Sequence, residues 1–341
     1  MARYFSFGGG RRIGRDRRLL YTILPLLIFV VVVTFIYAYP FGKNRPEPAV
    51  AQNDPNMQRE PVLPVLPLSV ESEPNLLRTI PEPNSRPDAR AAKLITEAMA
   101  LVNASPDGII YTRDRLNEVL ALPMSKQQRA FVKKQLPELA DKWLFSKAIF
   151  AQDMLCSRYR VKPGDQLRTI ARQFKVPWEI LLEINKIRRP ELLRAGEVIK
   201  VIHGPFHVRI YRSTFTMDLY LQNTYVRSFR VGLGRPGMET PTGLWRVKAG
   251  GKLIKPVWTN PLTGKTYKPT DEDYPLGSRW IGLEGIKGEA KGRKGFAIHG
   301  TKKPEEIGTR SSQGCIRLHN GDAILIYNLL VPLYSHVEIV P

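Results

Sequence analysis

Cysteine is scarce in this chain, because its 341 residues include only two, Cys156 and Cys315. A secreted fold held by several disulfides is therefore excluded, and at most one bridge remains open. The five histidines show no metal-ligand spacing, so we expect neither a metal site nor another cofactor. A lone thiol in an exported protein calls for a chemical reason, which directs attention to the surroundings of each cysteine.

Acidic residues are also few, since 31 Asp and Glu stand against 52 Lys and Arg and give a formal net charge of +21. Such an excess favours an anionic partner: a nucleic acid, an anionic lipid or an acidic wall polymer. No aromatic stacking pattern accompanies the basic residues, so a nucleic-acid partner is not expected. The choice between the other two depends on where the protein resides.

Only one long hydrophobic run is present, from Leu19 to Tyr39, and its 21 residues carry no charge. That length spans an apolar bilayer core of about 30 Å. The preceding residues 1–18 are rich in arginine and are expected to stay cytoplasmic, so the rest of the chain would lie outside, in the periplasm or cell-wall space. A cleaved signal peptide is the alternative, although its apolar stretch is usually only about 7–15 residues long. Both interpretations place the body of the protein outside the cytoplasm.

Two segments separate this run from the remainder of the chain. Residues 40–88 include eleven prolines among polar residues, which predicts an extended linker rather than a packed core. Residues 89–156 show apolar residues at three- and four-residue spacing and predict helices, one of them starting at Ser125 with Gln128 three residues later. The role of this helical region is open between a spacer and a dimerisation surface.

Residues 158–203 resemble a LysM domain over its whole length, with a predicted strand–helix–helix–strand order. The resemblance rests on four stretches: Val161–Leu167, Ile170-Ala171, Ile184-Asn185 and Leu193–Ile199. LysM domains bind glycans that contain N-acetylglucosamine, chiefly peptidoglycan. The resemblance implies a sugar groove at two loops, with Gly164, Asp165, Gln166, Leu167 and Arg189 as the candidate glycan-binding residues. The alternative for residues such as Leu167 is a place in the core.

Residues 204–341 predict a mainly-β domain. Two stretches, 207–213 and 217–223, alternate apolar and polar residues, a third strand follows over 224–234, and one helix is expected over 321–330. We expect a β-sandwich or a flattened barrel that carries this helix. The whole chain is therefore expected to be multidomain.

The segment 295–322 contains the residues that can carry chemistry. A strand is expected to deliver His299, and Cys315 follows among small residues. A thiolate attacks carbonyl groups, and a neighbouring imidazole can generate it. The backbone N–H groups of Gly314 and Cys315 are candidates for an oxyanion hole, and Arg317 is a candidate for binding a substrate carboxylate. Taken alone, a Cys/His pair is weak evidence, because buried cysteines and histidines are common.

The order of motifs in residues 204–341 resembles the L,D-transpeptidase catalytic (YkuD-type) domain. The motifs are His299-Gly300-Thr301 and Ser312-Gln313-Gly314-Cys315-Ile316-Arg317, with upstream segments 231–234, 240–243 and 275–280 in agreement. The family often has histidine at the position of Gln313. The resemblance implies a β-sandwich, Cys315 as the nucleophile, His299 as its base and the carbonyl of Gly300 as the group that orients the imidazole. Ser312, Gln313 and Arg317 are then the candidate substrate-binding residues, and an ion pair with Asp322 is the alternative for Arg317.

The activity implied by this resemblance is transpeptidation of peptidoglycan. Cys315 would attack the third residue of a tetrapeptide stem, D-Ala would leave, and an acceptor amine would resolve the thioester into a 3→3 cross-link. Covalent inhibition by carbapenems is also implied. Water as acceptor would give a carboxypeptidase, a protein acceptor would give attachment to the wall, and a degenerate site would leave a glycan-binding scaffold.

Overall fold

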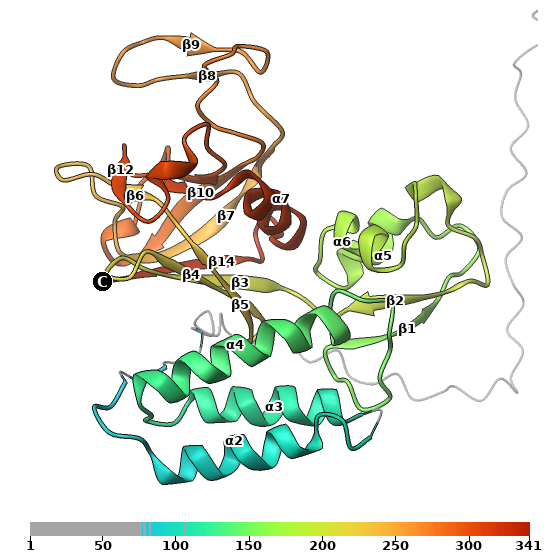
Figure 1. Cartoon of the computed structure of the whole chain (residues 1–341). Helices are drawn as coiled ribbons and strands as arrows, with labels where there is room; N and C mark the ends of the chain where they lie inside the picture. The colour runs from blue at the N-terminus through green and yellow to red at the C-terminus, as the bar shows by residue number, and fades with distance from the viewer. Residues whose placement is uncertain (1–76, 78–79, 82, 106) are drawn as a thin grey trace, which may run out of the picture. The chain divides into compact units, whose positions relative to one another are not determined.

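The computed structural model describes residue 77 and residues 80–81, 83–105 and 107–341 (Figure 1). These residues fall in one compact unit, Glu71–Pro341. The predicted cytoplasmic tail and membrane anchor, 1–18 and 19–39, lie outside the described residues, as does most of the predicted linker. Within the described ranges, none of the helices combines the length and the apolar character that crossing a bilayer requires.

The predicted helical region forms three helices: α2 (Ala89–Leu101), α3 (Gly108–Leu120) and α4 (Lys126–Trp143). Their starts follow from local capping. The carboxylate of Asp88 accepts the N–H of Ala91 at 2.7 Å and caps α2. At α4, the Ser125 hydroxyl accepts from Gln128 N and the Gln128 side chain accepts from Ser125 N, which is the capping box expected from the sequence.

This helical region packs against the β-sheet formed by residues after 204. The ammonium of Lys133 on α4 lies 2.5 Å from a carboxylate oxygen of Asp218 on β4 (Thr216–Leu221), and the Asp218 side chain is fully buried. Asn117 on α3 accepts the backbone N–H of Tyr225, at 2.7 Å, on β5 (Thr224–Arg230). These contacts show that the region packs against the β domain after residue 204.

The LysM-like unit has the expected strand–helix–helix–strand order. Its elements are β1 (Cys156–Arg160), α5 (Leu167–Gln173), α6 (Trp178–Ile184), the short 3₁₀ helix η1 (Pro190–Leu192) and β2 (Val198–Ile202). Strands β1 and β2 pair antiparallel. The first turn is fixed by Asp165, whose carboxylate accepts from Lys162 N and from the Tyr159 hydroxyl, both at 2.8 Å. This turn sets the entrance to α5.

The domain after residue 204 is mainly β, as expected. Eight strands form one mixed sheet in the order β13-β11-β10-β7-β14-β3-β4-β5. Apart from β4 and β5, its strands are β3 (Phe206–Tyr211), β7 (Gly243–Leu253), β10 (Trp280–Lys287), β11 (Ala297–His299), β13 (Ile316–Arg317) and β14 (His336–Val340). The alternating stretches predicted at 207–213 and 217–223 overlap β3 and β4, each of which begins one residue earlier and ends two residues earlier.

The remaining elements of this domain are short. They are β6 (Leu233–Gly234), β8 (Trp258–Thr259), β9 (Thr266–Tyr267), the 3₁₀ helices η2 (Gly288–Ala290) and η3 (Pro304–Glu306), β12 (Arg310–Ser312) and α7 (Asn320–Leu329). Strand β12 pairs with β6 and β8 pairs with β9. The helix predicted over 321–330 is α7, which begins one residue earlier and ends one residue earlier.

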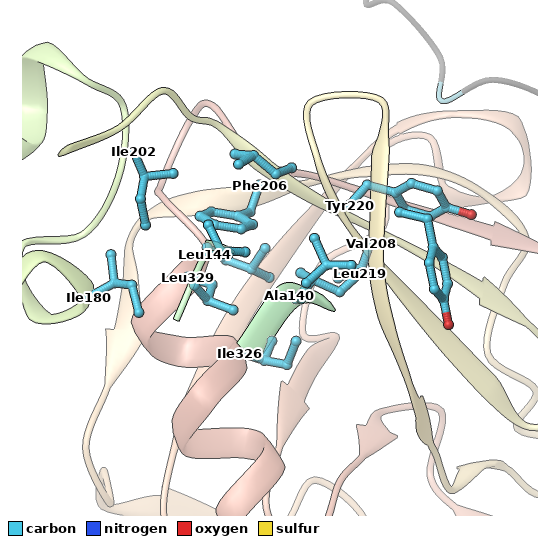
Figure 2. Close-up of a cluster of buried hydrophobic side chains, with 14 of the residues drawn as sticks. Ala140, Leu144, Ile180, Ile202, Phe206, Val208, Leu219, Tyr220, Ile326 and Leu329 are labelled. Carbon is cyan, nitrogen blue, oxygen red and sulfur yellow. The ribbon is translucent and has the colours of Figure 1, made fainter. Parts of the chain in front are cut away.

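Buried apolar side chains from several elements belong to one hydrophobic cluster. Figure 2 shows a part of it, in which Phe206 and Val208 of β3 and Leu219 of β4 lie near Ile326 and Leu329 of α7. All five of these side chains are fully buried. Burial of an aliphatic or aromatic side chain contributes about 1.5–3 kcal/mol, so this cluster fixes α7 against the sheet that carries the candidate site.

A second buried cluster, of polar groups, surrounds Cys156. The guanidinium of Arg113 lies 2.7 Å from a carboxylate oxygen of Asp153, and these two side chains are 2% and 0% exposed. The fully buried ammonium of Lys200 donates to the carbonyl oxygens of Trp143 and Ser146. The Cys156 thiol is free and buried, and burial, the largest cause, raises its pKa.

Candidate active site

Cys315 lies on a tight turn between β12 and β13. The turn requires a glycine before it, because Gly314 has φ of +108°. A Cβ at this position would also lie 2.8 Å from the Phe296 ring. The turn is fixed by Ser312, whose hydroxyl donates to the Cys315 carbonyl at 2.6 Å and accepts from Gly314 N at 3.1 Å. The sequence therefore places the thiol at a defined point ahead of β13.

Ser312, a predicted substrate-binding residue, lines the thiol cavity and also holds this turn. Its side chain is buried, with 1% of the residue exposed. The N–H of Gly314, predicted as an oxyanion donor, is already engaged by the Ser312 hydroxyl. Of the two predicted donors, the N–H of Cys315 is thus the one left for that role in this arrangement.

His299 ends β11, which pairs in parallel with β13, so that His299 stands opposite Arg317 and Ile298 opposite Ile316. This pairing brings the histidine close to the turn that bears the cysteine, although sixteen positions separate them in the sequence. His299 Nδ1 lies 2.6 Å from the carbonyl oxygen of Gly300. Since a carbonyl can only accept, Nδ1 carries the proton and Nε2 remains the basic nitrogen.

Gly300 is also required for space. A Cβ on it would lie 2.2 Å from the amide oxygen of Asn320. Asn320 joins two loops at this point, because its amide oxygen accepts from Ser278 N and its amide nitrogen donates to the carbonyl of Thr301, both at 2.9 Å. The close packing holds the backbone segment that bears His299.

A cavity of about 160 Å³ contains both side chains. The Trp280 ring stacks on the imidazole of His299, with 5.6 Å between the ring centroids and 18° between the planes. The cavity is lined by His299, Cys315, Arg317, Ser312, Gln313, Gly295, Trp258, Asn260, Pro261, Tyr267, Pro275, Leu276 and Trp280. It leaves a small space beside the thiol, with aromatic walls from β8, β9 and β10.

Burial sets the protonation states of the pair. It lowers the pKa of His299 to about 4, an effect to which the charge of Arg317 adds and which the Gly300 carbonyl opposes. Burial likewise raises the pKa of the Cys315 thiol to about 11. At neutral pH both groups are therefore uncharged, and transfer of the thiol proton to the imidazole is unfavourable in the resting site.

Gln313 is exposed at the cavity wall. Its side-chain nitrogen lies 3.5 Å from the amide oxygen of Asn260, at the limit of a hydrogen bond. Gln313 also lines a neighbouring, larger cavity of about 640 Å³, together with Arg212, Gly237, Met238, Glu239, Pro241, Pro261, Leu262, Glu289, Arg293 and Phe296. It therefore stands between the two spaces.

Arg317 lines the thiol cavity, but its ion-pair partner is not the residue the sequence suggested. The guanidinium Nη1 pairs with a carboxylate oxygen of Glu306, at the end of η3. The alternative of an ion pair for Arg317 holds, but with Glu306 in place of Asp322, because Asp322 lies on the first turn of α7 while the η3 loop brings Glu306 to β13. The sequence offered no signal for this pair, since an acidic residue in a long loop has no marker of its partner.

Thr240 is a further residue that the sequence did not single out by function. Its buried hydroxyl donates to the Gly314 carbonyl at 2.9 Å and accepts from Gly234 N at 3.0 Å. It belongs to the segment 240–243 that agrees with the family pattern. Thr240 thus holds the carbonyl side of the turn whose other side Ser312 holds.

The predicted glycan-binding residues are brought together only in part. Asp165, Gln166 and Leu167 line a cavity of about 380 Å³ with Arg168 and with Pro190, Glu191 and Leu193 from the other loop. Leu167 is also a core residue, with 1% exposed. Gly164 and Arg189 do not line this cavity; Gly164 has φ of +85°, which the turn requires, and Arg189 is exposed at the start of η1.

No group of three or more His, Cys, Asp or Glu side chains arranged for a metal ion occurs in the described part of the chain. The arrangement around Cys315 is instead that of a nucleophile with a neutral base in a shaped pocket.

Comparison with known proteins agrees with the two resemblances. The L,D-transpeptidase catalytic domain family (YkuD) matches residues 205–339, and the LysM domain family matches residues 159–201. A relative named "Putative L,D-transpeptidase YkuD" in Bacillus subtilis strain 168 is 29% identical over 191 residues, which cover 53% of this chain and 97% of the relative.

Two more relatives extend this result. "Putative L,D-transpeptidase YqjB" of Bacillus subtilis strain 168 is 30% identical over 138 residues, 40% of this chain and 72% of the relative. "Probable L,D-transpeptidase ErfK/SrfK" of Escherichia coli K12 is 32% identical over 179 residues, 49% of each chain. With this similarity and the Cys315–His299 site, the chain belongs to the L,D-transpeptidase (YkuD) family and carries a LysM domain ahead of its catalytic domain.

Proposed function

We propose that the protein is a peptidoglycan L,D-transpeptidase that works through a cysteinyl thioester and forms 3→3 cross-links. The observation that carries the proposal is the pairing of β11 with β13, which puts His299 and Cys315 in one cavity with Nδ1 of the imidazole bound to the Gly300 carbonyl. Because Nδ1 donates to the Gly300 carbonyl, Nε2 is the proton acceptor for the thiol in this proposal.

In the first half of the reaction, Sγ of Cys315 attacks the carbonyl of the third stem residue while Nε2 of His299 takes the thiol proton. Since the thiol holds its proton much more tightly than the imidazole would, transfer accompanies formation of the S–C bond instead of preceding it. The N–H of Cys315 donates to the oxyanion. The C–N bond to D-Ala then breaks, and the imidazolium returns the proton to the leaving amine.

In the second half, the amine of an acceptor stem attacks the thioester carbonyl. His299 takes a proton from this amine, the C–S bond breaks, and the thiolate leaves and recovers the proton from the imidazolium. Every bond broken is matched by one formed, and no group outside this chain and the two stems is needed. Water in place of the amine gives a carboxypeptidase, and a protein amine gives attachment to the wall.

The remaining parts of the chain fit this activity as proposals. LysM binding of peptidoglycan, at the loops around Asp165–Leu167, would hold the enzyme on its polymeric substrate. A membrane anchor at residues 19–39 would keep the catalytic domain on the outer side of the membrane, where the wall is built. Carbapenems would acylate Cys315, because their carbonyl meets the same nucleophile.

The test is incubation of the purified full chain, in detergent, with disaccharide-tetrapeptide. Mass spectrometry follows loss of D-Ala and appearance of dimers, with Cys315→Ala in parallel. Dimers made only by the unmutated protein support the transpeptidase. Tripeptide without dimers would shift the assignment to carboxypeptidation. No change with any stem, while the protein still binds the glycan, would overturn the enzyme assignment in favour of a wall-binding scaffold.

A further inference from the structure

Arg317, which lines the thiol cavity, is already paired with a carboxylate of the protein. Glu306 and Arg317 form an ion pair in which both side chains are largely buried, 21% and 20% exposed. The same carboxylate oxygen of Glu306 accepts from the Ser311 hydroxyl at 3.3 Å, and its other oxygen lies 3.3 Å from the Lys303 ammonium. Glu306 is thus held by three donors at the edge of the site.

The backbone fixes this carboxylate next to β13. Glu306 closes η3, and its carbonyl accepts the N–H and the hydroxyl of Thr309 at 3.2 and 2.7 Å. Gly232 exchanges two 2.9 Å hydrogen bonds with Arg317, and a Cβ on Gly232 would lie 2.9 Å from the Glu306 carbonyl oxygen. Glycine at 232 therefore allows the η3 loop to approach Arg317 closely.

This arrangement leaves the Nε donor of Arg317 without a partner. Its Nε is buried and has no hydrogen-bond partner in the structure, while Nη1 is taken by Glu306. A buried donor without a partner is unfavourable, so a substrate oxygen that reaches Nε as the stem enters the cavity removes this penalty. With the charge of Arg317 already balanced, the acceptor that suits it is a neutral carbonyl oxygen.

Resting on the function proposed above, we infer that Glu306 determines the charge of the stem group accepted beside Cys315: it favours a neutral carboxamide or carbonyl at Arg317 and disfavours a carboxylate. A stem carboxylate must either displace Glu306 or lie beside it, and two carboxylates sharing one guanidinium repel each other. A carboxamide meets no such repulsion, and its oxygen can accept a hydrogen bond from the guanidinium.

The test compares two tetrapeptide donors that differ only in the side-chain terminus of the third residue, a carboxylate or its carboxamide. kcat and KM are measured for the full-length protein, for Glu306→Gln and for Glu306→Ser. The selectivity for carboxamide over carboxylate is expected to fall about tenfold in both variants, equivalent to about 1.4 kcal/mol, mainly through a lower KM for the carboxylate stem. Glu306→Asp, which keeps the charge, is expected to retain the selectivity.

Glu305→Gln is the matched control, because it removes a negative charge at the neighbouring position, where the side chain is exposed. It should leave the selectivity unchanged. An equal selectivity in the unmutated protein, Glu306→Gln and Glu306→Ser would overturn the inference, as would an equal effect of Glu305→Gln.

Binding of the same two stems to Cys315→Ala, with and without Glu306→Gln, separates this inference from the proposed function. Calorimetry on these proteins measures the selectivity without turnover. If no stem is turned over by the unmutated protein, the proposed activity fails, and the binding ratio still decides the role of Glu306. If stems are turned over but neither ratio changes on mutation, only the inference about Glu306 fails.

Discussion

The two cysteines of this chain both have a raised thiol pKa, but their surroundings differ. Burial is the first cause of the raised pKa at both Cys156 and Cys315. Around Cys156 the polar neighbours are charged groups such as Arg113 and Asp153, which are paired with each other. Around Cys315 there is a cavity and the neutral imidazole of His299. A cavity and an imidazole that lines it, rather than the resting pKa, distinguish the second site.

The largest expected difference between the two sites is in turnover. Cys315→Ala should lower kcat by at least about 10³-fold, since the nucleophile is lost and only binding and electrostatic effects remain. Cys156→Ala should leave kcat within about twofold. Both are measured by release of D-Ala from a tetrapeptide donor. A strong loss in Cys156→Ala without a loss of stability would break the contrast.

The second difference is in the pH dependence of alkylation. Because the pKa of Cys315 is raised to about 11, its thiolate fraction grows about tenfold per pH unit at every pH below that value. The iodoacetamide rate at Cys315 should therefore rise about 10³-fold from pH 7 to pH 10, read by peptide mass spectrometry.

In the same experiment, Cys156 should stay unlabelled until the protein unfolds, because only 1% of it is exposed. A Cys315 rate that is already constant between pH 6 and pH 8 would contradict the neutral pair, since it would indicate a thiolate–imidazolium pair at rest.

The third difference is in stability. Asp153→Ala leaves the buried charge of Arg113 without its buried partner and should lower the free energy of unfolding by about 3–5 kcal/mol. Asp114→Ala is the control, because Asp114 contacts the same guanidinium at 2.7 Å but is 53% exposed, and it should cost less than about 1 kcal/mol.

Urea unfolding of both variants measures this effect. Equal costs for the two aspartates would contradict a special role for the buried Arg113–Asp153 pair beside Cys156.

The sequence predicts most of the site because the relevant signals are local. The motifs at Gly314, at His299 and at the first LysM turn are each made of residues within a few positions of one another. The structure brings His299 and Cys315 into one cavity. The alternation in the sequence also predicts the strands β3 and β4, but both are buried at most positions rather than half-buried.

What the sequence leaves open depends on contacts between distant segments. Strand β14 is last in the chain yet lies between β7 and β3, and no local pattern encodes that order. The pairing of Arg317 with Glu306 depends on how the η3 loop folds back, and the contact of Lys133 with Asp218 spans 85 positions. For the same reason the helical region could not be recognised as a packing partner of the sheet.

The most direct test of the thioester account is mass spectrometry of the intact protein, quenched in acid during turnover of a disaccharide-tetrapeptide. A thioester between Cys315 and the tripeptide stem should appear as an added mass that maps to the peptide containing Cys315. The mass should be absent from Cys315→Ala and present in Cys156→Ala. Turnover without any adduct on Cys315, or an adduct on Cys156, would contradict the account.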